Sequence, residues 1–143
     1  MLSKKTQYAF RALVHLAQHH GKEPVRISEI ARDQQIPLKF LENILNELKK
    51  ADILESKKGK GGGYSLKMPP QKLNLATVIR IINGPIALLP CVSLNFYERC
   101  LDCDETTCGI RKMMIVARDA TLKVLEKKTL LDVINGTIDR KPD

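Results

Sequence analysis

The spacing of apolar residues predicts three helices in the first fifty residues. We expect one helix over residues 3–20 and a short second helix over 28–33, which the Ser28 hydroxyl would cap. A third helix is expected to begin at Pro37, whose missing N–H is tolerated in a first turn, and to end near Lys50. A short helix, a tight turn and an amphipathic helix in this order are typical of a helix-turn-helix. The apolar face of the third helix consists of Phe40, Leu41, Ile44, Leu45 and Leu48.

Two short alternating runs follow the third helix, at residues 53–56 and 64–66, and they flank a loop rich in glycine and lysine. Such a loop between two strands predicts a β-hairpin, and a hairpin directly after a helix-turn-helix forms a wing. The next helix is expected over residues 75–82, where Asn83-Gly84-Pro85 stops it.

The C-terminal part combines a loop without periodicity and a long helix. Residues 86–108 hold all four cysteines and form an ordered loop only if some contact ties them down. A helix of about five turns is expected from Thr107, and a short helix follows, opened by Thr129 with Asp132. An apolar stripe on the long helix has no later helix to cover it, which predicts packing against a second copy of the chain. The stripe consists of Ile110, Met113, Met114, Ala117, Thr121, Val124 and Leu125.

The formal net charge of +8 is concentrated in the N-terminal part of the chain. Residues 1–67 include 13 basic and 7 acidic side chains, which leaves a net charge of +6 there. Such a field attracts polyanions or acidic membrane surfaces. No stretch approaches the roughly 20 apolar residues of a membrane span, and no signal-peptide pattern follows the first residues. We therefore expect a cytoplasmic protein without a membrane partner.

Lysines in the glycine-rich loop and polar residues on the third helix supply the chemistry for binding double-stranded DNA. Glycine lets the wing tip approach the phosphate backbone closely, and lysine supplies the charge. On the third helix, Asn43 can pair with adenine and Glu42 can accept from the cytosine amino group. A solvated loop and the ordinary polar face of a helix are the alternative interpretations. The predicted DNA-binding residues are Ser28, Lys39, Glu42, Asn43, Lys57, Lys58, Lys60, Gly61 and Tyr64.

The remaining polar residues do not indicate catalysis. No serine, histidine and acid arrangement is present, and the glycine-rich loop lacks the ending of a phosphate-binding nucleotide loop. His15, His19 and His20 are interpreted as ordinary surface or core residues. The sequence thus predicts a non-enzymatic, mainly α protein with a small β-hairpin wing. Its expected parts are a winged helix-turn-helix DNA-binding domain (1–84), a cysteine-containing sensor loop (85–108) and a dimerisation helix with the C-terminal tail (109–143).

The four cysteines, Cys91, Cys100, Cys103 and Cys108, fall within eighteen residues. Thiolates clustered in this way can bind zinc or an iron–sulfur cluster, because both favour sulfur ligands from a loop that folds around them. The spacing matches neither a standard ferredoxin run nor a usual zinc ribbon. Free buried cysteines are the remaining alternative.

Four segments together resemble the Rrf family of winged-helix transcription regulators, which includes IscR, NsrR, RirA and CymR. The resemblance runs from Met1 to about Ile134, and the Gly-Gly-Gly-Tyr wing is its most specific part. It implies a homodimer joined through the long helix, with each winged helix reading half of a near-palindromic DNA operator. The segments are Leu2-Ser3-Lys4-Lys5-x2-Tyr8-Ala9, Ile27-Ser28-Glu29-Ile30-Ala31, Phe40-Leu41-Glu42-x4-Glu47-Leu48-Lys49-Lys50-Ala51 and Gly59-x-Gly61-Gly62-Gly63-Tyr64-Ser65-Leu66.

The cluster-binding members of this family imply a [4Fe–4S] or [2Fe–2S] cluster, with Cys91, Cys100 and Cys108 at the three cysteine positions. The fourth ligand differs from those of the family. Arg111 stands where IscR has its histidine ligand, and Gln7 stands near the position of the aspartate ligand of NsrR. Cys103 is the replacement expected here. The sequence thus predicts a regulator that senses iron, redox state or nitric oxide. A clusterless or zinc-binding regulator, controlled by a partner protein or a thiol as in CymR-like members, is the alternative.

Overall fold

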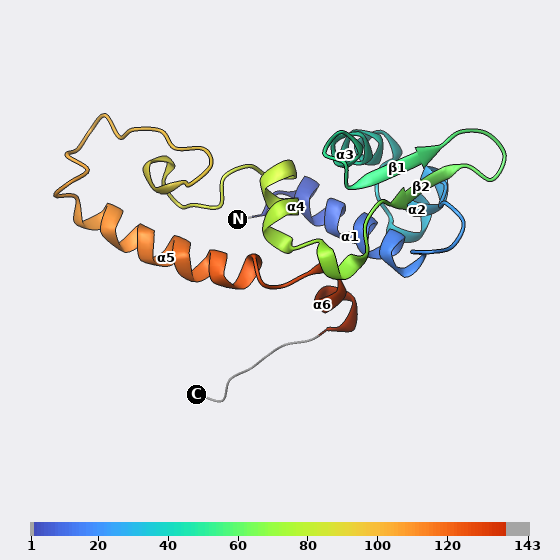
Figure 1. The fold of residues 1–143 in the computed structure, drawn as a ribbon. Helices are drawn as coiled ribbons and strands as arrows, with labels where there is room; N and C mark the ends of the chain where they lie inside the picture. The colour runs from blue at the N-terminus through green and yellow to red at the C-terminus, as the bar shows by residue number, and fades with distance from the viewer. Residues whose placement is uncertain (1, 137–143) are drawn as a thin grey trace.

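The computed structural model describes residues 2–136 (Figure 1). Met1 and the predicted C-terminal tail from 137 onward lie outside the described residues. The described chain is mainly helical with one two-stranded antiparallel hairpin, which confirms the predicted fold class. In chain order the elements are α1 (Lys4–Gln18), α2 (Ile27–Gln34), α3 (Leu38–Lys50), β1 (Leu54–Lys57), β2 (Gly63–Leu66), η1 (Pro70–Lys72), α4 (Leu75–Ile82), η2 (Pro90–Val92), α5 (Gly109–Leu125) and α6 (Leu130–Asn135).

One apolar core joins α1, α2, α3 and the hairpin into a winged helix-turn-helix. The hairpin pairs Leu54 with Leu66 and Lys57 with Gly63, which places its two leucines against the helices. Burial of these side chains is the main source of stability for such a small unit. Fully buried members of the core are Leu13, Leu16, Ile30, Leu41, Ile44, Leu45, Leu48, Ile53 and Leu54.

The start of α2 differs from the prediction, because Ser28 does not cap it. The helix begins at Ile27, and its N-cap is Arg26, which makes no side-chain capping bond. Backbone hydrogen bonds between Val25 and Tyr64 of β2 hold the chain extended just before this helix. The helix can begin directly after this bridge, so a contact distant in sequence overrides the local capping signal. Ser28 is an exposed residue of the first turn.

The α3 helix follows its predicted apolar pattern except at its start. Pro37 precedes the helix as its N-cap instead of occupying the first turn. Phe40 is 40% exposed and packs edge-to-face against Tyr8 of α1, with ring centroids 5.6 Å apart. It lies at the rim of the core because Leu41 and Ile44 already fill the interior side of the first turns.

Glycine is required in the wing by the fold itself. Gly63 has φ of +145°, and a Cβ there would lie 2.4 Å from the carbonyl oxygen of Val25. A Cβ on Gly62 would lie 2.3 Å from the carbonyl oxygen of Lys57. Both glycines therefore allow the wing to close and to pair with the segment before α2. A Cβ on Gly59 or Gly61 would meet nothing within 4 Å, so at these two positions the absence of a side chain leaves space at the wing tip.

The long helix α5 projects away from the winged helix, and the cysteine-containing loop lies at its far end (Figure 1). The chain then returns to the body, where Leu130 of α6 is fully buried. Thr129 and Asp132 form the predicted capping box at the start of α6. Within residues 2–136, no helix combines the length and apolar character needed to cross a membrane.

Candidate nucleic-acid interface and cysteine site

The predicted DNA-binding residues lie on three neighbouring parts of the winged helix. Polar side chains of α3 and the wing lysines are exposed, whereas the backbone of Tyr64 is used to pair with Val25. The wing loop projects beyond the helical body (Figure 1). The exposed members of the predicted set are Ser28, Lys39, Glu42, Asn43, Lys57, Lys58, Lys60 and Gly61.

A polar hollow beside α3 was not predicted from the sequence. Asn43 lines it together with Asn46 and Lys50 of the same helix, and Lys5 of α1 lies at its edge. The Lys5 ammonium group forms an ion pair with Glu47, which fixes α1 against α3. The polar face available to a ligand therefore extends beyond the first turns of α3.

The structure brings all four cysteines to one pocket of about 460 Å³ at the N-terminal end of α5. Cys91 is buried beside η2, Cys100 and Cys108 are half-buried, and Cys103 is exposed at the opening. Apolar residues, including Ile110 and Leu101, line the same pocket. The loop between the cysteines thus folds around a common space.

Three of the sulfur atoms interact with one another. A hydrogen bond with Cys100, together with one to Cys108, raises the pKa of the Cys103 thiol to about 12. The backbone N–H of Arg111 donates to Cys108 Sγ at 3.5 Å and lowers the pKa of that thiol. Cys108 is the N-cap of α5, so the helix dipole also favours its thiolate.

Glu105 anchors the loop, a role that sequence analysis did not detect. Its carboxylate accepts the backbone N–H of Cys100 at 3.0 Å and the Tyr97 hydroxyl at 2.8 Å. These hydrogen bonds, the Cys100 N–H first, lower the pKa of the Glu105 carboxyl. Arg111 Nε lies 3.9 Å from the same carboxylate. The guanidinium thus faces an acid of the loop instead of serving as a ligand.

A second contact ties the loop to α5. Arg118 donates from Nη1 to the carbonyl oxygen of Val92 at 2.6 Å, directly after Cys91. The N–H of Glu98 also donates to the carbonyl oxygen of Pro90 at 3.2 Å. These bonds hold the first part of the loop, residues 90–98, to itself and to α5, which accounts for the order of this aperiodic segment.

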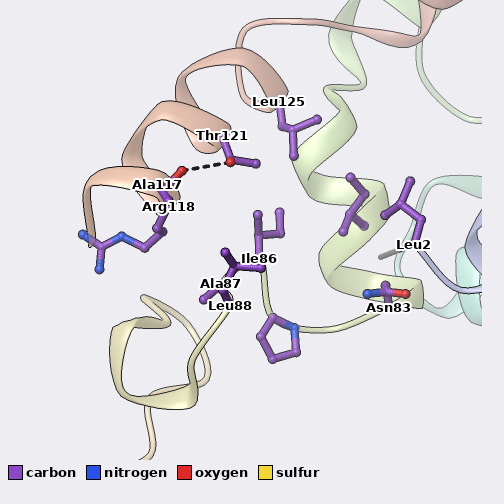
Figure 2. Close-up of a pocket in the computed structure, with 11 residues that line it drawn as sticks. Leu2, Asn83, Ile86, Ala87, Leu88, Ala117, Arg118, Thr121 and Leu125 are labelled. Atoms are coloured by element: carbon purple, nitrogen blue, oxygen red, sulfur yellow. Dashed lines mark hydrogen bonds between the residues drawn. The ribbon is translucent and has the colours of Figure 1, made fainter. Parts of the chain in front are cut away.

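A groove of about 360 Å³ separates α5 from the end of α4 and the chain after it (Figure 2). Leu2, Ile86 and Leu88 line one side, and Ala117 and Leu125 of α5 line the other. The groove is mainly apolar and opens toward solvent. It continues the exposed apolar face of α5.

That face consists of residues on the side of α5 opposite its contact with the body. Leu122 is the buried residue of α5, whereas Met113 is 59% and Val116 63% exposed. Ile110 and Val124 are exposed on the same face. Of the predicted stripe, Ile110, Met113, Thr121 and Val124 are exposed in the single chain, whereas Met114, Ala117 and Leu125 are half-buried.

A winged helix-turn-helix with a lysine-bearing wing defines the class of DNA-binding transcription regulators of the helix-turn-helix type. The family model Rrf2, described as an iron-dependent transcriptional regulator, matches residues 2–136. The chain therefore belongs to the Rrf2 family, whose members are transcription regulators and not enzymes.

Individual relatives match along nearly the whole chain. An rrf2-like helix-turn-helix regulator from Rhodobacter capsulatus is 38% identical over 138 residues, which cover 94% of this chain and 92% of that protein. The structure of CymR, the global cysteine regulator of B. subtilis, superposes with a TM-score of 0.78 at 28% identity, covering 96% of this chain and 98% of that one. T. potens IscR gives a TM-score of 0.75 at 25% identity, with 99% and 93% coverage.

Proposed function

We propose that this regulator acts as a homodimer on a two-fold-related DNA operator and senses iron, redox state or nitric oxide through a cysteine-ligated iron–sulfur cluster. One observation carries the proposal: four cysteines share a pocket at the start of the helix whose apolar face is left uncovered. Anaerobic purification followed by visible absorption and by iron, sulfide and zinc analysis tests it. Iron and sulfide in equal amounts support a cluster, and stoichiometric zinc without iron contradicts it.

In the proposed complex, the N-terminal turns of α3 meet base edges in the major groove. Glu42 and Asn43 would read bases, while Ser28 and Lys39 would help to position the helix. Lys57, Lys58 and Lys60 of the wing would contact phosphate or the adjacent minor groove. The exposure of all these side chains in the free chain supports the assignment.

Replacing Lys57, Lys58 and Lys60 together by alanine is expected to flatten the salt dependence of operator binding. Each phosphate contact releases counterions, and six to ten contacts give a loss of about 10³ to 10⁵ in affinity between about 50 and 200 mM salt. Removing three contacts lowers the slope of log affinity against log salt by about 3. Fluorescence anisotropy over a salt series measures this slope, and an unchanged slope contradicts the role of the wing.

Glu42→Ala and Asn43→Ala provide the matched comparison for the lysine variant. Each is expected to relax preference at one or two operator positions by about 1 to 3 kcal/mol, because base contacts specify sequence. Competition among single-base operator variants measures the change. An equal loss of affinity for every operator variant would contradict the role of these residues in reading bases.

The donor set in the pocket fits an iron–sulfur cluster. Four thiols line one space, and cysteine thiolate is the usual ligand of both [2Fe–2S] and [4Fe–4S] clusters. Zinc takes the same ligands, so the metal and sulfide analysis decides between the two. We assign Cys91, Cys100, Cys103 and Cys108 as the ligands of the cluster.

When bound, the cluster would supply iron and sulfide that react with oxidants or nitric oxide. Under iron-deficient conditions the cluster would not be assembled. The chain's own residues hold and orient it: Cys108 is favoured as thiolate at the helix start, and Glu105 holds the Cys100 backbone. Apolar side chains, including Ile110, line part of the pocket, which is open to solvent where Cys103 is exposed. Loss of the cluster would loosen the loop at the start of α5 and so change how the two winged helices are spaced.

Replacing Glu105 by alanine is expected to weaken cluster retention while leaving the winged helix folded. Residues that orient ligands typically change metal affinity by about 10- to 100-fold when removed. Tyr97→Phe, which removes only the hydroxyl bond to Glu105, should have a smaller effect. Iron release to a chelator under anaerobic conditions measures both. Asp104→Asn, at an acid of the same loop that does not line the cysteine pocket, is the control. Equal release rates in all variants would contradict the anchoring role.

The homodimer is proposed from the uncovered face of α5 and the groove beside it. Two copies of α5 packed along this face would cover Met113, Val116 and Val124 in each chain. Small residues at Ala117 and Ala120 would allow the helices to approach closely. Contiguous exposed apolar surface of this kind marks an interaction site in soluble proteins.

A clusterless regulator controlled by a thiol or a partner protein is the second candidate function. The lowered pKa of Cys108 beside the exposed Cys103 favours it, because a thiolate next to a second thiol is suited to reversible oxidation. The fold similarity to CymR also supports it. The metal and sulfide analysis of the anaerobic protein separates the two candidates.

A further inference from the structure

Three potential metal ligands meet between α1 and α2, away from the cysteine loop. His15 lies in the last turn of α1, His19 is the C-cap of that helix, and Glu29 lies in the first turn of α2. Ligand atoms from the three side chains all lie within 4.8 Å of one another. The two imidazole rings stack with centroids 4.8 Å apart. Histidines at this helical spacing present their rings on the same face.

The hydrogen bond made by Nδ1 of His19 leaves Nε2 of the same ring free to bind a metal ion. Its Nδ1 lies 2.8 Å from the carbonyl oxygen of His15. A carbonyl oxygen only accepts, so Nδ1 carries the proton and donates it. In the neutral ring, Nε2 is then unprotonated and available as a ligand. A backbone carbonyl on the second ring nitrogen is the arrangement that typically orients metal-bound histidine.

His15 is only 6% exposed, and its Nε2 is buried without a hydrogen-bond partner. Its Nδ1 lies 3.1 Å from the amide nitrogen of Gln34 at the end of α2. A buried polar atom without a partner is costly and calls for an explanation. A metal ion bound at this nitrogen would satisfy it, and a ring nitrogen of His15 lies within 4.8 Å of ligand atoms of His19 and Glu29.

We propose that His15, His19 and Glu29 form a binding site for a divalent transition-metal ion of the zinc class. Two imidazoles and one carboxylate suit such an ion, with water completing a tetrahedral shell. Glu29 lies in the first turn of α2, at the positive end of the helix dipole. This site uses no cysteine and goes beyond the proposed function, so either can fail without the other.

Binding at His15 Nε2 requires a shift of the ring proton to Nδ1, with no net proton released by that ring. The Gln34 amide would then turn its oxygen toward Nδ1, a rotation that exchanges two atoms of nearly equal size. Gln34 immediately precedes the turn into α3, where Gln35 is left-handed with φ of 53°. The ion would therefore hold α1 and α2 together next to the helix-turn-helix turn and make this part of the DNA-binding unit more rigid.

The test is zinc titration by calorimetry of the full chain with all four cysteines replaced by serine, which removes competing thiolates. We expect one zinc per chain with an affinity in the micromolar range, and zinc should raise the unfolding temperature. His19→Ala and Glu29→Gln should each weaken binding by at least about tenfold, and Gln34→Ala by about 10- to 100-fold as the group that orients His15. His20→Ala, an exposed histidine outside the site, is the matched control and should bind as the parent does.

Nitrogen-15 spectra of the histidine rings in the same protein give an independent readout. Zinc should shift Nε2 of His15 and His19, while Nδ1 of His19 stays protonated. The absence of saturable binding, a His19→Ala variant that binds as the parent does, or equal weakening in His20→Ala would overturn the proposal. Wild-type protein that binds zinc only through its cysteines, with unshifted histidine signals, would also overturn it.

Discussion

Replacing Cys91, Cys100 or Cys108 by serine is expected to abolish stoichiometric iron and sulfide in anaerobically prepared protein. A serine hydroxyl stays protonated near neutral pH and is a poor ligand for iron, whereas the three thiols line one pocket. Operator affinity should change together with the iron content, because the loop leads directly into α5. A coupling of about 1 to 3 kcal/mol between the two sites is typical, which corresponds to about 5- to 150-fold.

Cys103→Ser separates a fourth cysteine ligand from a free thiol. If Cys103 completes the set, its variant should lose iron as the other three do. Far-ultraviolet circular dichroism of each variant checks that the winged helix stays folded. Full iron retention after replacement of Cys91, Cys100 or Cys108 contradicts the assigned ligands, and so does an iron-free wild type with one zinc per chain.

Replacing Met113 by aspartate is expected to convert the regulator to monomers and to weaken operator binding with it. An unpaired buried charge costs about 3 to 5 kcal/mol, and a two-fold interface carries the change twice. Each such cost corresponds to about 10² to 10⁴ in the dimer dissociation constant. The side chain is 59% exposed in the single chain, so the fold of the monomer should tolerate the change. Light scattering and anisotropy measure the two effects.

Lys112→Asp is the matched control for the dimer prediction, because it places the same carboxylate one residue away and off the apolar face. It should remain dimeric, although its DNA affinity can fall slightly through the change in charge. A monomeric wild type, or a Met113→Asp variant that stays dimeric at micromolar concentration, would contradict the proposed interface.

Sequence analysis succeeded for elements that depend on neighbouring residues. The bounds of α4 and the capping box of α6 agree with the prediction, because apolar spacing and capping act within one or two turns. It was wrong about the cap of α2, where the bridge between Val25 and Tyr64 decides the start. It also placed Phe40 on the apolar face of the third helix with four leucine and isoleucine residues that are buried, whereas the Phe40 ring is 40% exposed at the rim of the core.

The sequence by itself determined the winged helix-turn-helix, the wing, the long helix and the four cysteines as a group. Only the tertiary structure brought Glu105 to the Cys100 backbone and brought Glu29 to the two histidines at the C-terminal end of α1. The physical reason is the range of the interactions. Periodicity and capping act between residues a few positions apart, whereas a site formed by different segments depends on how the core packs and where each loop closes.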